Sequence, residues 1–112
     1  MKYALLVYDV PNSWSSLSTE EKRAAHGDYS AVAATPGIIG HYRVRPPQSA
    51  TTVRVEEGQI VRTEGHFANT REIFRAFYLL EGDDHDAVLE LAARIPAART
   101  GGAVEVWPLT ER

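Results

Sequence analysis

The sequence lacks cysteine altogether, and it has neither a long apolar run nor an excess of positive charge. Without cysteine the chain cannot form disulfide bonds, thiolate metal sites or thiol nucleophiles, and such a composition is typical of a reducing compartment. No stretch approaches the ~20 apolar residues of a membrane span. The start Met1-Lys2-Tyr3 leads into a predicted strand, and no small-residue cleavage site follows it. We therefore expect a cytoplasmic protein without membrane contacts.

The features that bind nucleotides and nucleic acids are also missing. A net charge of -3 and a pI near 5.8 provide no basic face for phosphate backbones. No glycine-rich phosphate loop follows the first strand, and there is no Gly-x-Ser-x-Gly turn. A chain of 112 residues with 44% apolar and 24% charged residues is typical of one globular domain, here residues 1–112. The expected partner is a small molecule or a protein.

Hydrophobic periodicity predicts two helices and six strands. The first helix begins with a capping box, because Glu21 follows Ser18 by three residues, and Pro36-Gly37 ends it. The last helix has apolar residues at the i, i+3, i+4 and i+7 positions from Val88, and Pro96 ends it. The predicted strands cover residues 2–8, 38–44, 51–55, 59–63, 76–80 and 103–107.

The predicted order is strand, helix, strand, hairpin, strand, helix, strand. It matches a ferredoxin-like (βαββαβ) sandwich of the α+β class with an inserted β-hairpin, of the dimeric α/β-barrel type. Two helices cover only one face of such a sheet, so the other face has to meet water or a second subunit. We therefore predict a homodimer packed sheet to sheet, with a pocket either between helices and sheet or at the subunit junction.

The second predicted strand has one unusually polar face. Ile39, His41 and Arg43 share that face by strand alternation, whereas Ile38, Tyr42 and Val44 share the opposite one. We expect the polar face to be the one that the helices leave uncovered. There His41 and Arg43 either line a dimer cavity or remain solvated.

The whole chain resembles the YCII-related superfamily, and specifically its DGPF branch. The matching segments are residues 1–8, 50–55, 64–72, 92–99 and 102–106. The resemblance implies a dimeric ferredoxin-like fold. It also implies a small enzyme that needs no cofactor, since better understood relatives use a histidine and an aspartate for proton transfer, including the dehydrohalogenation of ring compounds.

The resemblance assigns two residues to that chemistry. In the YCII group the histidine lies in the first helix, three residues after an arginine, and Arg23-Ala24-Ala25-His26 has this spacing. Asp9 at the end of the first strand corresponds to the acid and would fix the tautomer of His26. By helical periodicity His26 lies at the edge of the buried stripe, so we expect it to be half-buried. Its imidazole can donate or accept a proton near neutral pH.

The turn at residues 64–67 reads Glu-Gly-His-Phe, where the name motif of the branch is Asp-Gly-Pro-Phe. His66 therefore adds an imidazole where the branch has proline. It is either a solvated loop residue or a second proton-transfer group that shares a pocket with His26. Asn69, with Glu72 three residues later, is a possible cap for one short helical turn.

Rings and polar side chains suggest a flat-walled pocket for an aromatic ligand, in which arginine could clamp a carboxylate or phenolate. The candidate substrate-binding residues are Tyr8, Tyr29, His41, Arg43, Glu64, Phe67, Arg75 and Trp107. Core packing is the better explanation for any single aromatic residue. The other rings that could wall such a pocket are Tyr3, Trp14, Tyr42, Phe74, Phe77 and Tyr78. The spacing of His26, His41 and His66 contains no close ligand pair, so we predict no metal site.

These features predict a cofactor-independent enzyme that uses His26 or His66 as general acid or base on a small cyclic or aromatic metabolite. The reaction would be an isomerisation, elimination or cyclisation and would fit secondary metabolism. One alternative is a non-catalytic ligand-binding or regulatory dimer, because most of the DGPF branch has no established activity. Another is a cofactor-free monooxygenase, since that chemistry also occurs in dimeric ferredoxin-like barrels.

Overall fold

The computed structural model describes residues 1–67 and 71–111, and the cap expected at Asn69 lies outside them. Its helices and strands are β1 (Lys2–Asp9), α1 (Thr19–Ala33), β2 (Ile38–Arg43), β3 (Thr51–Glu56), β4 (Gln59–Glu64), β5 (Ile73–Glu81), α2 (His85–Ala93) and β6 (Ala103–Pro108). Short 3-10 helices lie at Pro47–Ser49 (η1) and Pro96–Arg99 (η2). No helix in the described part of the chain is long and apolar enough to cross a membrane.

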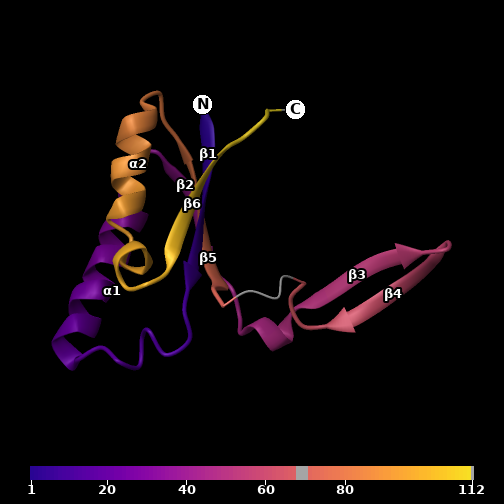
Figure 1. The fold of residues 1–112 in the computed structure, drawn as a ribbon. Helices are drawn as coiled ribbons and strands as arrows, with labels where there is room; N and C mark the ends of the chain where they lie inside the picture. Colours follow the sequence, from indigo (N-terminus) through magenta and orange to yellow (C-terminus); the bar gives the residue numbers. More distant parts are fainter. Residues whose placement is uncertain (68–70, 112) are drawn as a thin grey trace.

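One antiparallel sheet has the strand order β2-β5-β1-β6, and β3 pairs with β4 in a separate hairpin. Both helices lie on the same face of the four-stranded sheet (Figure 1). Without the inserted hairpin, this is the order of a ferredoxin-like α+β fold. The predicted fold class is therefore confirmed.

The core lies between the helices and the central strand β1. Leu5 and Val7 of β1 have no exposed surface, and neither do Val32 of α1 and Ile95 after α2. Burying each such side chain contributes roughly 1.5–3 kcal/mol relative to exposing it. The predicted capping box is also present, since the Ser18 hydroxyl accepts a bond from the Glu21 amide and the Glu21 carboxylate accepts one from the Ser18 amide. The buried side chains hold α1 against the sheet, and the capping box defines where the helix begins.

The orientation predicted for β2 was wrong. One extra residue bulges between Ile38 and Gly40, so Ile38 lies opposite Leu80 whereas Gly40 lies opposite Leu79. A one-residue bulge reverses the faces of the residues beyond it relative to those before it. His41 therefore lies beside buried Tyr78 on the helix side of the sheet, and Arg43 lies on the same side. Ile38 shares their face, not the face of Tyr42.

The face opposite the helices is uncovered in the single chain. Tyr42 is 68% exposed on this face and Trp107 is 53% exposed, which are high fractions for large rings. Phe77 packs between Tyr42 and Phe74, with ring centroids 5.8 Å and 6.4 Å away. The described part of the chain therefore leaves an aromatic surface open on the sheet.

Candidate active site

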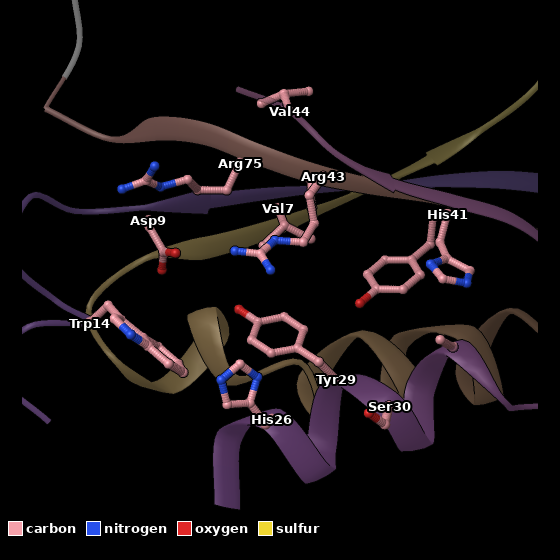
Figure 2. Close-up of a pocket in the computed structure, with 13 residues that line it drawn as sticks. Val7, Asp9, Trp14, His26, Tyr29, Ser30, His41, Arg43, Val44 and Arg75 are labelled. Carbon is pink, nitrogen blue, oxygen red and sulfur yellow. The ribbon is translucent and has the colours of Figure 1, made fainter. Parts of the chain in front are cut away.

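A cavity of about 490 Å³ lies between α1 and the sheet (Figure 2). Its lining combines rings with ionisable groups from both layers. The lining residues are Val7, Asp9, Trp14, His26, Tyr29, Ser30, Ala33, His41, Arg43, Val44, Arg75, Ala76 and Tyr78. Of the two pocket positions predicted from the sequence, this is the one between helices and sheet. Its volume is within the usual range for small-molecule sites.

A second bulge brings Arg75 to this cavity. Val7 of β1 lies opposite Ala76 of β5, but the next residue, Tyr8, lies opposite Phe74, so Arg75 is the extra residue. Bulges re-aim side chains that strand alternation would send to the other face. Arg75 and Ala76 therefore both border the cavity although they are consecutive.

His26 reaches the cavity from α1, beside the indole of Trp14. The two ring centroids are 4.9 Å apart and the rings meet edge to face at 73°. His26 is exposed, not half-buried as expected, because the cavity leaves its ring open. Within the described residues Asp9 forms no hydrogen bond or salt bridge with His26, and Figure 2 shows its carboxylate near Arg75 across the cavity. Trp14, not Asp9, is the group that packs against the imidazole.

Burial and charge act on Asp9 in opposite directions. Loss of solvent raises the pKa of this carboxyl group above its ordinary value of 3.8, while the Arg75 guanidinium and a hydrogen bond with Ser13 lower it. The first effect is the largest, so the net direction is upward. Burial in the cavity therefore disfavours the ionised form of Asp9, and the positive charge of Arg75 offsets part of that cost.

The two tyrosines of the cavity remain protonated near neutral pH. Burial raises the pKa of Tyr29 to about 12, with the Asp9 charge adding to the effect and Arg43 opposing it. Burial also raises the pKa of Tyr78, again against Arg43. Both phenols can therefore donate a hydrogen bond to a ligand oxygen.

Among the described residues the two arginines of the cavity form no salt bridge, although the Arg75 charge acts on Asp9 from a greater distance. Across residues 1–67 and 71–111 the salt bridges join Arg99 to Asp28 and the amino terminus to Asp83. Within these residues neither Arg43 nor Arg75 has a carboxylate oxygen within 4 Å. The cavity contains two guanidinium groups and one carboxyl group whose ionised form is disfavoured by burial. It is therefore electropositive, which favours an anionic ligand oxygen.

Asp9→Asn is expected to make the folded protein more stable near neutral pH. Because the pKa of Asp9 is raised on folding, its protonated form contributes stability that is present below the ordinary pKa and lost as the pH rises through the raised value. A neutral amide retains this contribution at every pH. Thermal denaturation at about pH 7 and about pH 3 should show the larger gain at the higher pH. A gain independent of pH, or a loss at neutral pH, would contradict this assignment.

Six predicted site residues meet in the cavity, namely Asp9, His26, Tyr29, His41, Arg43 and Arg75. The other five lie elsewhere in the single chain. Tyr8 and Trp107 are on the uncovered sheet face, where the Trp107 indole nitrogen donates to the Glu105 carboxylate over 3.1 Å. Glu64, His66 and Phe67 lie at the base of the hairpin, outside the cavity lining, and the Phe67 ring lies 4.8 Å below the Arg54 guanidinium.

Trp14 and Tyr78 line the cavity. Both are among the rings named as possible walls of a flat pocket, but neither is among the candidate substrate-binding residues. Tyr78 stacks on His41 with centroids 5.8 Å apart and an interplanar angle of 26°. Trp14 lies in the loop between β1 and α1, and a large ring in a loop rich in serine was the available signal. Tyr78 gave no signal of its own, because a buried aromatic residue in a central strand is ordinary core.

The fold and the cavity define a small ferredoxin-like protein with a polar, aromatic-walled pocket between its first helix and its sheet. The sequence model of the YCII-related domain matches residues 1–111. An uncharacterized protein of Rhizobium meliloti (strain 1021) is 33% identical over 114 residues, which cover 97% of this chain and 92% of that protein. The chain belongs to the YCII-related family, as its sequence motifs predicted.

A solved structure has the same fold. It is the 5-chloro-2-hydroxyhydroquinone dehydrochlorinase of Burkholderia phenoliruptrix AC1100 in complex with 2,5-dihydroxybenzoquinone, and its TM-score is 0.53. The match covers 100% of this chain and 96% of that one, at 15% sequence identity. At this identity the similarity shows the fold, and the chemistry has to be argued from the residues of this chain.

Proposed function

We propose that the cavity is the active site of a small cofactor-independent enzyme that transfers a proton on a small cyclic or aromatic metabolite. The main support is that His26 opens onto the same cavity as Arg43 and Arg75. An imidazole can take up a proton near neutral pH, and the guanidiniums can stabilise the negative charge that is left on the substrate. The neutral phenol of Tyr29 adds a donor for an oxygen of the ring.

In this mechanism His26 removes a proton from an acidic C–H or O–H group of the bound ring. The electron pair of the broken bond stays on the ring and delocalises onto a ring oxygen beside the arginines. If the proton returns at another atom, the reaction is an isomerisation; if a leaving group departs with its bonding electrons, it is an elimination. Attack of the anion on an electrophilic atom of the same molecule would be a cyclisation.

The walls of the cavity support a flat substrate. Trp14, Tyr29 and Tyr78 present rings to it, and rings of this kind bind planar ligands by stacking and edge contacts. The related dehydrochlorinase is named for a chlorinated hydroxyhydroquinone, a ring compound with acidic hydroxyl groups. A hydroxylated ring with a delocalised negative charge is therefore the substrate class that we propose.

Arg43→Gln and Arg75→Gln are each expected to weaken binding of an anionic ring compound by about 10-fold or more, the cost of one lost charge-assisted hydrogen bond. The probe is 2,5-dihydroxybenzoquinone, measured by isothermal titration calorimetry. Arg62→Gln on the hairpin is the matched control and should bind as the wild type does. Equal affinity in all four proteins would contradict the proposed role of the cavity arginines.

The catalytic proposal itself is tested on a panel of hydroxylated and chlorinated ring compounds, with products followed by mass spectrometry. Product formed without added cofactor supports the enzyme. Saturable binding of a panel member without any product would favour the ligand-binding alternative. Oxygen uptake that matches product formation would indicate a monooxygenase, in which the proton-transfer reaction is not the whole chemistry.

We further propose that the protein is a homodimer that covers the uncovered sheet face. Tyr42, Phe77 and Trp107 form an aromatic surface there, and an apolar surface of this kind is typical of a protein contact. Two copies related by a two-fold axis would each use the same face. Such a dimer is compatible with the cavity, which lies on the opposite, helix side of the sheet.

A further inference from the structure

The β3–β4 hairpin extends away from the body of the protein, on the side of the sheet opposite the helices (Figure 1). Its cross-strand pairs place Val53 opposite Arg62 and Val55 opposite Ile60. Val53, Val55 and Ile60 therefore share one face of the hairpin with Arg62, because paired residues in antiparallel strands point to the same side. The three apolar side chains lie next to one another on this face, and Arg62 lies beside them towards the base of the hairpin. We call residues 51–64 the arm, and these three side chains its apolar face.

The apolar face is uncovered in the single chain. Val53 is 60% exposed, Val55 68% and Ile60 64%, whereas the core aliphatic residues of the sheet are almost fully buried. The opposite face of the arm is mostly polar and consists of Thr52, Arg54, Glu56, Gln59, Val61 and Thr63, with Val61 as its apolar member. Burial of these three side chains against another surface would stabilise the hairpin.

The arm has little support from its own chain. Among the described residues, β3 and β4 form a two-stranded sheet of their own and pair with no strand of the main sheet. An isolated two-stranded hairpin is marginal in water, and packing against another surface is what stabilises it. The missing surface is therefore expected on another molecule.

We propose that the apolar face of the arm packs on a second copy of this chain, while the arm of that copy packs reciprocally on the first. The inference rests on the proposed homodimer and adds a second contact to it. The arm projects on the same side as the aromatic sheet face, so a copy seated on that face lies within its reach. Six residues per strand give the arm a length of about 20 Å, enough to pass the edge of a partner sheet.

Charge also favours a second copy over a nucleic acid or a membrane surface. The arm has arginines at positions 54 and 62 and glutamates at positions 56, 57 and 64, so it has no cluster of one sign. The surface of the same chain that is open to it is aromatic and apolar, at Tyr42 and Trp107. An apolar arm and an apolar face on one molecule are complementary in a two-fold dimer.

The first test compares two triple variants of the arm by sedimentation equilibrium. Val53→Thr, Val55→Thr and Ile60→Thr remove the apolar face but keep residues that favour strands. Glu56→Thr, Gln59→Thr and Val61→Thr make the same number of changes on the opposite face. We expect the dissociation constant of the dimer to rise by about 10-fold or more in the first variant and to stay within about 2-fold of wild type in the control.

The possible outcomes distinguish the proposed arm contact from the proposed sheet-face dimer. A wild-type dimer whose dissociation constant is unaffected by the first triple variant would overturn the arm proposal and leave the sheet-face dimer standing. A wild-type protein that is monomeric at all concentrations would overturn both. Thermal unfolding of the two triple variants establishes that each one still folds, since the arm is outside the core.

A second measurement does not depend on weakening the dimer. The chain has no cysteine, so a single introduced cysteine can be labelled cleanly. Val55→Cys places a spin label on the apolar face, and Glu56→Cys places it on the opposite face of the same arm. We expect the label at position 55 to be immobilised in the dimer and freed on dilution, and the label at position 56 to be mobile throughout. Equal mobility at the two positions would overturn the proposal.

Discussion

Replacing His26 by glutamine is expected to lower kcat/KM by about 100-fold to 10,000-fold on any panel compound that the wild type converts. His26 is the imidazole that opens onto the cavity, and glutamine keeps a polar side chain of similar reach without a group that takes up protons near neutral pH. The exposed position of His26 means that the substitution should leave folding intact. Steady-state kinetics and thermal unfolding of the same preparations test both statements.

His66→Gln is the matched control for that experiment. His66 lies at the base of the hairpin, outside the cavity lining of its own chain. We therefore expect His66→Gln to retain kcat/KM within about 3-fold of wild type, a change too small for the loss of a general base. A large loss of kcat/KM in His66→Gln with little loss in His26→Gln would contradict this assignment. It would imply that His66 is the general base and acts in the cavity of a partner subunit.

Gly102→Ala is expected to destabilise the protein by about 3 kcal/mol, at the upper end of the range for overpacking. A methyl group at position 102 would lie 2.1 Å from the carbonyl oxygen of Tyr8 and 3.0 Å from that of Ala97. Both obstacles are backbone atoms, which cannot rotate away as a side chain would. The strain falls where β6 joins the end of β1, next to Asp9, and urea denaturation measures it.

The same substitution in α1 should have the opposite sign. Gly27 lies within the helix, and a methyl group there would meet nothing within 4 Å. Gly27→Ala is therefore expected to stabilise the protein by about 0.5–1 kcal/mol, because alanine has less backbone freedom to lose on folding. Destabilisation by both variants, or by neither, would contradict the packing that places Gly102 against β1.

The fold was predictable because its signals are local and agree with one another. The Ser18–Glu21 capping box starts α1, and the apolar spacing from Val88 defines the buried side of α2. The apolar run predicted as a strand at residues 2–8 is the inner strand β1 of the sheet. Each of these patterns lies within one element, where a helical period or a strand period holds without interruption.

The site was predicted in part, and the errors have a structural cause. His26 and Asp9 were assigned from the resemblance to the YCII group, and Tyr29 as a ring that could wall a pocket; all three line the cavity. His41 and Arg43 were assigned to the wrong face, since the bulge after Ile38 shifts the alternation by one residue and no local signal marks it. The separation of His66 from the cavity depends on the direction in which the hairpin leaves the body, which is a tertiary property.

Deuterium exchange shows whether the cavity transfers protons through His26. Hydroxylated ring compounds, beginning with 2,5-dihydroxybenzoquinone, are incubated in D2O with wild-type, His26→Gln or His66→Gln protein, and loss of ring C–H signals is followed by proton NMR. We predict that the wild type and His66→Gln accelerate exchange over the protein-free rate and that His26→Gln does not. Exchange at the wild-type rate in His26→Gln, or no acceleration by the wild type of any compound that it binds, would contradict this role of His26.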